Sequence, residues 1–163
     1  MQWIKYILIY ILLLFIEKNL LQLISIKDVT PDLILIFVII ISLKEKRSSA
    51  TLIGFGAGLF QDLFTAGFFG LSAMTKSIIG FWGTFFQQSR KKYNLTYFTV
   101  AVFVLVFIHE IIYRSIYNLG SHISLFRLIF HYIIPRTLYT LSFGIIIYLI
   151  YKPMFWKSES ITD

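Results

Sequence analysis

Six apolar stretches, separated by short polar breaks, decide which folds are open to this chain. A helix that crosses a lipid bilayer needs about 20 mostly apolar residues, and this length sets how the stretches divide into helices. The approximate ranges are 3–23, 30–43, 48–64, 68–86, 95–117 and 124–151. The sequence therefore predicts an all-α integral membrane protein, in which residues 1–163 form a single domain built as a compact bundle of six transmembrane helices.

Composition excludes a cytosolic globular protein. Hydrophobic residues make up 58% of the chain and charged residues 14%, whereas a soluble domain carries about a quarter charged residues. A soluble fold of this length would need more polar surface to cover its core than the sequence supplies. The first apolar stretch lacks a small-residue cleavage site at its end, so we expect that helix to be retained.

Several classes of chemistry find no support in the residues. The chain has no cysteine, and His109, His122 and His131 lack the spacing of a metal site. No phosphate-binding glycine loop, nucleophile elbow or pair of catalytic carboxylates is present. The formal charge of +7 comes from basic residues in short loops, and not from one basic face of the kind that binds nucleic acid. We therefore expect no enzyme activity, no metal, no cofactor and no nucleic-acid partner.

The second apolar stretch is too short to cross a bilayer upright. Thr30 can cap its helix, Pro31 can occupy the first turn, and Asp32 can interact with the positive end of the helix dipole. The stretch then runs for only about 14 residues. Either this helix is buried among its neighbours, or Lys44 and Lys46 reach past its end to the membrane surface.

The later stretches have two features of shape. A turn over residues 65–67, where Gly67 permits an abrupt change of direction, predicts a tight hairpin between the third and fourth helices. The sixth stretch is longer than a bilayer requires and contains Pro135 in its middle. We expect a single helix that is kinked near this proline.

Orientation follows from the positive-inside rule. With the N-terminus inside, the cytoplasmic side carries nine basic residues, namely Lys5, Lys44, Lys46, Arg47, Arg90, Lys91, Lys92, Lys152 and Lys157. The outer side carries Lys18 and Lys27, and the remaining basic residues lie within the spans. Six spans with both termini in the cytoplasm preserve this asymmetry, which predicts a multi-pass protein of the inner membrane.

Two groups of residues in the hairpin are candidates for partner contact or internal structure. Gly54 and Gly58 form a small-residue face on the third helix, which suits either internal packing or the docking of a partner helix. Asp62 and Lys76 lie at similar depth on either side of the turn, so they could pair directly. An unpaired charge in hydrocarbon costs several kcal/mol, which leaves a structural ion pair and a partner contact as open alternatives.

A second set of charges lies on the last two helices. Glu110 and Arg114 are spaced i, i+4 in the order that favours a pair on one helix face. Arg127 and His131 fall at comparable depth across the outer loop, so these four residues can meet, whereas Arg136 lies farther in. Such a cluster can hold helices together, line a ligand pocket or relay protons. Arginine does not release its proton, which argues against a relay.

Two motifs carry a resemblance to a known family. Residues 30–35 read TPDLIL and residues 53–64 read IGFGAGLFQDLF. Residues 67–74, GFFGLSAM, follow with Gly70 before the fourth helix, and Gly80 lies within that helix. This pattern resembles the rod shape-determining protein MreD family over about residues 30–85. Elsewhere the resemblance is one of length and hydropathy.

The resemblance implies a non-catalytic scaffold of the cell-wall elongation machinery. Such a protein binds MreC and, with RodA, a class B penicillin-binding protein and the MreB filament, supports rod shape and lateral peptidoglycan synthesis. The family is similar in fold to the substrate-binding subunits of energy-coupling-factor vitamin transporters, so a transporter subunit that holds an anionic ligand at Glu110, Arg114 and Arg127 is the alternative. Those subunits carry small residues on the first helix, whereas residues 3–24 contain no alanine or glycine. A third hypothesis is that the same arginines receive an anionic lipid head group.

Overall fold

Every regular element that the structure describes is a helix. The computed structural model describes residues 2–19, 29–65, 68–87, 94–119 and 125–156. The elements are α1 (Gln2–Asn19), α2 (Leu33–Ser42), α3 (Arg47–Leu63), α4 (Leu71–Gly83), the short 3-10 helix η1 (Thr84–Phe86), α5 (Leu95–Tyr117), α6 (Leu125–Leu128), the π-helical segment η3 (Ile129–Ile133) and α7 (Ile134–Trp156). These helices fall within or close to the predicted ranges, and the all-α class is confirmed.

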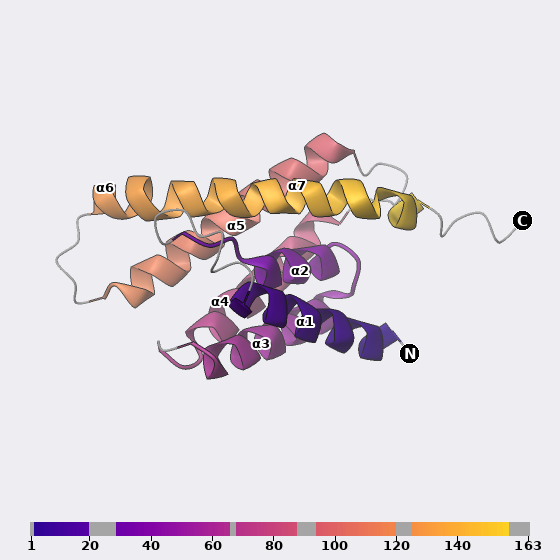
Figure 1. Ribbon diagram of the computed structural model, residues 1–163, viewed down its shortest axis with the longest axis horizontal. Helices are drawn as coiled ribbons and strands as arrows, with labels where there is room; N and C mark the ends of the chain where they lie inside the picture. Colours follow the sequence, from indigo (N-terminus) through magenta and orange to yellow (C-terminus); the bar gives the residue numbers. More distant parts are fainter. Residues whose placement is uncertain (1, 20–28, 66–67, 88–93, 120–124, 157–163) are drawn as a thin grey trace, which may run out of the picture.

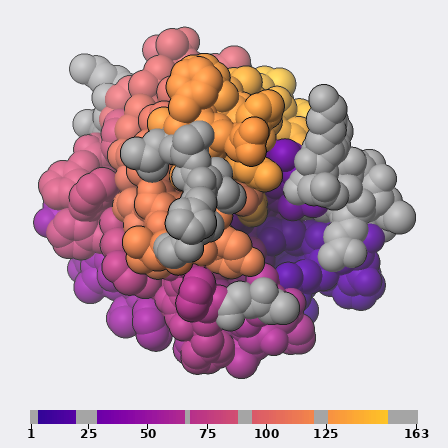
Figure 2. Space-filling model, turned by 90° about the vertical axis from the view of Figure 1, so that its left-hand side faces the viewer, coloured from indigo at the N-terminus to yellow at the C-terminus, as the bar shows by residue number. Residues whose placement is uncertain are grey.

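Successive helices run in alternating directions and form a bundle. In Figure 1, α1 starts at the right-hand end, α2 returns toward it, and α7 ends there as well. The left-hand end holds the end of α5 and the start of α6. We call this left-hand end the far end and the opposite one the near end. Figure 2 views the far end, where the orange side chains of α5 and α6 lie above the magenta side chains of the α3–α4 hairpin.

Helix α2 is the central helix of the bundle. It is 10 residues long, and of these only Ile40 is not fully buried. It contacts α1, α3, α4, α5 and α7. At a rise of 1.5 Å per residue it spans about 15 Å, or half of a bilayer's hydrocarbon core of about 30 Å. Of the two sequence-based explanations for its shortness, burial among neighbouring helices is confirmed.

The start of α2 differs from the prediction in its capping residue. Thr30 was expected to cap the helix, with Pro31 in its first turn, but the helix begins at Leu33 and its N-cap is Asp32. The Asp32 side chain accepts a hydrogen bond from the Leu35 amide at 2.7 Å. An N-cap must be extended and must reach an amide in the first turn, and Asp32 meets both conditions because its backbone is extended and directly precedes the helix.

Helices α3 and α4 approach so closely that their backbones touch. A Cβ atom at Gly54 would clash with the Lys76 carbonyl, and one at Gly58 would clash with the Ser72 carbonyl. Gly80 on α4 faces the Ala50 carbonyl in the same way. The internal-packing interpretation of the glycine face is therefore confirmed. Gly67, expected to form the turn, lies outside the described residues.

Residues 125–156 form one continuous helix with a local irregularity. The π-helical segment η3 ends two residues before Pro135. Proline lacks an N–H group and its ring crowds the carbonyl of the preceding turn, so a wider turn at this point accommodates the ring without ending the helix. The prediction of a single helix is confirmed, and the predicted kink stays a prediction, since the irregularity near Pro135 is a π-helical turn.

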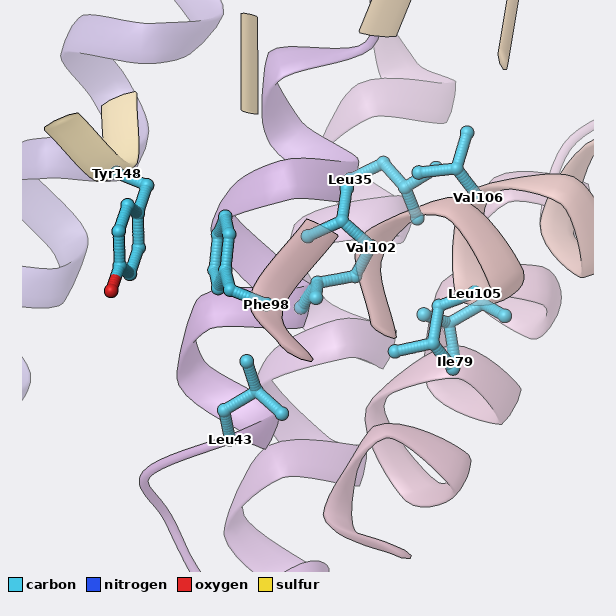
Figure 3. Close-up of a cluster of buried hydrophobic side chains, with 9 residues drawn as sticks. Leu35, Leu43, Ile79, Phe98, Val102, Leu105, Val106 and Tyr148 are labelled. Atoms are coloured by element: carbon cyan, nitrogen blue, oxygen red, sulfur yellow. The ribbon is translucent and has the colours of Figure 1, made fainter. Parts of the chain in front are cut away.

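An apolar core fills the half of the bundle toward the near end. Figure 3 shows side chains from four helices converging there: Leu35 and Leu43 of α2, Ile79 of α4, Phe98, Val102, Leu105 and Val106 of α5, and Tyr148 of α7. The rings of Phe98 and Tyr148 stack with their centroids 4.7 Å apart. This core joins α5 and α7 to the central helix.

Two of the described helices are long and apolar enough to cross a membrane, Leu95–Tyr117 with 23 residues and Phe126–Ile150 with 25 residues. The apolar helix Leu33–Ser42 is shorter. Many large hydrophobic side chains are exposed on the other helices as well, including Leu8 and Phe15 on α1 and Leu52 and Phe60 on α3. An exposed apolar surface of this extent is expected of a protein that contacts lipid or other proteins.

Candidate functional site

Polar and charged side chains gather inside the half of the bundle toward the far end. Among the described residues, ten of the twelve buried polar or charged side chains lie there: Asp32, Gln61, Asp62, Ser72, Thr75, Lys76, His109, Glu110, Thr137 and Thr140. The other two, Ser42 at the end of α2 and Thr84 at the start of η1, lie toward the near end. On each helix the ten lie toward the far end relative to the apolar core residues of the same helix. The bundle interior is therefore divided into an apolar half and a polar half.

The start of α2 explains part of this polar half. Because α2 is short and central, its first N–H groups lie inside the bundle, where they must find protein acceptors. Asp32 accepts from Leu35, and the Glu17 carboxylate of α1 accepts from the Ile34 amide at 3.2 Å. The Asp32 amide donates to the Thr140 hydroxyl of α7 at 3.2 Å. Side chains from neighbouring helices thus satisfy the backbone at the start of α2.

Lys76 pairs with Asp32, which corrects the hypothesis that it pairs directly with Asp62. The Lys76 ammonium lies 2.7 Å from Asp32 Oδ2, and the two side chains are 1% and 2% exposed. Each charge needs a neutralising partner at this burial, and the buried start of α2 brings Asp32 to the middle of α4. This ion pair joins the central helix to the hairpin.

Asp62 has a different role, as the cap of α4. Its carboxylate accepts hydrogen bonds from the amides of Gly70 at 2.9 Å, Ser72 at 3.1 Å and Ala73 at 3.2 Å. Gly70, the N-cap residue of α4, has a φ of 89°, a left-handed conformation that glycine adopts without strain. A carboxylate is also stabilised by the positive end of the helix dipole. Asp62, near the end of α3, therefore holds the start of α4 by hydrogen bonds in the interior of the bundle.

Glu110 is the centre of the charge network on α5 and α7. Its carboxylate lies 3.5 Å from Arg114 Nε, 3.3 Å from Arg136 Nε and 3.5 Å from His109 Nδ1. The predicted i, i+4 pair with Arg114 is confirmed. Arg136, which was expected to lie farther in, contacts Glu110 and also approaches Asp32 Oδ2 to 4.0 Å.

Arg127 and His131 do not join this network, contrary to the prediction. Both side chains are exposed on the part of the final helix that precedes Pro135. The predicted cluster assumed that equal distance from the outer loop brings residues together. The position of each residue around its helix also matters, and the π-helical turn shifts the face on which residues before Pro135 lie.

Sequence reasoning missed several members of the polar half. The Glu17 carboxylate accepts a hydrogen bond from the side-chain amide Nε2 of Gln61 at 2.7 Å. His109 Nε2 lies 3.3 Å from the Thr75 hydroxyl. Glu17 lies two residues before the end of α1. The signal that could have found it is the short second helix, whose buried first turn requires acceptors from other helices.

The network is balanced in formal charge. Ion pairs join Asp32 and Glu110 to Lys76, Arg114 and Arg136. Glu17, which is hydrogen-bonded to Ile34 and Gln61 beside these pairs, brings the acidic and basic side chains to three each. Asp62 lies apart and is compensated by the start of α4. Chemically, this arrangement holds five helices, namely α1, α2, α4, α5 and α7, at fixed depths relative to one another. Over the described residues, no group of three or more acidic or histidine side chains could hold a metal ion.

Comparisons of this chain with protein-family models, with curated proteins and with solved structures found no match.

Proposed function

We propose that the chain is a membrane scaffold of the MreD family. The observation that carries this proposal is the role of the two aspartates in the resembling motifs. Asp32 of TPDLIL caps α2, and Asp62 of the glycine-rich motif caps α4, and each lies inside the bundle. The residues that carry the resemblance are thus those on which the short central helix and the close hairpin depend.

The balanced charge network supports a structural role. An ionic network that neutralises itself holds helices in place and leaves the apolar outer faces for contact with lipid and partner proteins. In this proposal the protein binds MreC and, through the complex, RodA, a class B penicillin-binding protein and the MreB filament. It contributes to peptidoglycan synthesis by positioning these partners and not by catalysis.

We further propose that the chain makes six passes through the inner membrane, with both termini in the cytoplasm. The passes are α1, α2, α3, α4 with η1, α5, and the continuous helix over residues 125–156. The alternating helix directions and the basic residues at the near end support this topology. The chain has no cysteine, so single cysteines report position without a background.

In right-side-out membrane vesicles, a membrane-impermeant maleimide should label Leu119→Cys and should leave Lys46→Cys unlabelled until the membrane is permeabilised. Both positions are exposed, and α3, α4 and α5 separate them, so they should lie on opposite sides. Labelling of both positions from the same side would exclude three passes between them.

The functional test is affinity purification of the tagged chain from its own host in mild detergent, with the bound proteins identified by mass spectrometry. We expect recovery of MreC together with RodA or a penicillin-binding protein. Recovery of paired ATPases with a coupling membrane subunit would instead indicate the transporter subunit and would exclude the scaffold. Untagged membranes carried through the same steps provide the control.

A further inference from the structure

Arg114 and Arg136 have more hydrogen-bonding capacity than the protein uses. Each guanidinium carries several N–H donors in a rigid planar fork. Within the described part of the chain, the two side chains together donate one hydrogen bond, from Arg114 Nε to Glu110 Oε2 at 3.5 Å. The Nε of Arg136 lies 3.3 Å from Glu110 Oε1, but its orientation does not make a hydrogen bond.

Other polar atoms on the same two helices also make no hydrogen bond. Among the described residues, four buried atoms on α5 and α7 have no hydrogen-bond partner: His109 Nδ1, Glu110 Oε1, Arg136 Nε and Thr137 Oγ1. Three of these atoms lie in ion pairs with one another, since Glu110 Oε1 is 3.3 Å from Arg136 Nε and 3.5 Å from His109 Nδ1. Their geometry is too poor for hydrogen bonds, so the donors and acceptors at this position are only partly used. These four atoms lie on α5 and α7, whereas the Ile34 and Leu35 amides at the start of α2 have hydrogen-bond acceptors.

The site is accessible from the surface. Arg114 is 18% exposed and Arg136 is 20% exposed, although both contact the fully buried Glu110. The Arg114 guanidinium lies over the ring of Tyr132, 5.3 Å from its centroid, and Tyr132 is exposed. An aromatic ring that holds one face of the guanidinium leaves the edge of the fork directed to other acceptors.

We propose that Arg114 and Arg136 form a binding site for the phosphate group of an anionic ligand at the contact between α5 and α7. A phosphate offers several acceptor oxygens that match the guanidinium fork and can engage both arginines at once. The network as a whole is balanced in formal charge, so the phosphate would be held by the unused N–H donors of the two guanidinium groups and not by a net positive charge. This site goes beyond the scaffold role and does not depend on the family proposal.

Two sources can supply this phosphate, a membrane lipid or a soluble phosphate. Arg114 lies three residues before the end of α5, about 5 Å along the helix axis, which suits the level of lipid head groups. Ile111, three residues before Arg114 on the same helix, is an exposed hydrophobic side chain that suits an acyl chain. The experiment distinguishes the two sources.

The test uses the full chain in a non-ionic detergent and measures ligand binding by native mass spectrometry and by thermal stabilisation. The probes are short-chain phosphatidylglycerol, inorganic phosphate, and a diacylglycerol with the same acyl chains and no phosphate. We expect Arg114→Gln to weaken binding of the phosphate-containing probe about tenfold or more, because a charge-assisted fork is lost. Arg114→Lys, which keeps the charge and loses the fork, should fall between wild type and Arg114→Gln.

The matched control is Arg47→Gln, which removes the same charge at the near end, where Arg47 lies over the rings of Phe81 and Phe85. Its binding should stay within about twofold of wild type. Arg114-dependent binding of phosphatidylglycerol alone assigns the site to a lipid, and competition by inorganic phosphate assigns it to a soluble ligand. The proposal is overturned if neither phosphate probe binds, if diacylglycerol binds equally well, if binding survives Arg114→Gln in a folded protein, or if Arg47→Gln weakens it equally.

Discussion

Replacement of Lys76 by methionine should lower the free energy of unfolding by about 3–5 kcal/mol, the usual cost of breaking a buried ion pair from one side. Lys76 is 1% exposed and donates a 2.7 Å hydrogen bond to Asp32. Methionine fills a similar volume but leaves the Asp32 carboxylate with the Leu35 amide and, among the described cationic groups within 4 Å, only the Arg136 guanidinium at 4.0 Å. Unfolding in detergent followed by circular dichroism measures the loss.

Two further variants separate the lost pair from a general effect of lysine removal. Lys46→Met, at an exposed position, should change the free energy of unfolding by no more than about 0.5 kcal/mol. Asp32→Asn combined with Lys76→Met removes both charges and keeps an N-cap residue, so it should cost less than the sum of the two single changes. Wild-type stability in Lys76→Met would contradict the assignment of this pair.

Gly58→Ala should destabilise the protein strongly, whereas Gly56→Ala should not. A Cβ atom at Gly58 would clash with the backbone of Ser72, while one at Gly56 meets no atom within 4 Å. The clash is with backbone, which cannot move aside as a flexible side chain can, so α3 and α4 must separate. The expected cost is about 1–3 kcal/mol or more, because separation also weakens the Asp62 hydrogen bonds to the start of α4.

The two glycine variants are matched in residue type, helix and chemical change, and thermal unfolding of both in one detergent provides the comparison. Alanine has the higher helix propensity, so Gly56→Ala should be neutral or slightly stabilising. Equal destabilisation of the two variants would show that helix α3 responds to any added methyl group and not to contact with α4.

The helices themselves could be predicted because they depend on neighbouring residues in the chain. The predicted range 95–117 coincides with α5, and the others differ from the described helices by a few residues at their ends. Glu110 and Arg114 could likewise be paired in advance, since residues four apart on one helix lie on the same face whatever surrounds them.

The sequence by itself determined that this chain is helical, where its helices run, and which helix is short, because hydropathy and helical spacing are local properties. That the short helix α2 is buried among its neighbours was decided by the tertiary structure. Only the tertiary structure decided that Lys76 pairs with Asp32, that Asp62 caps α4, and that Arg136 in place of Arg127 reaches Glu110. Those pairings depend on the depth and rotation at which separate helices meet. The close packing of the glycine faces and the buried start of α2 set this depth and rotation. Neither depth nor rotation can be derived from the spacing of charges along the chain.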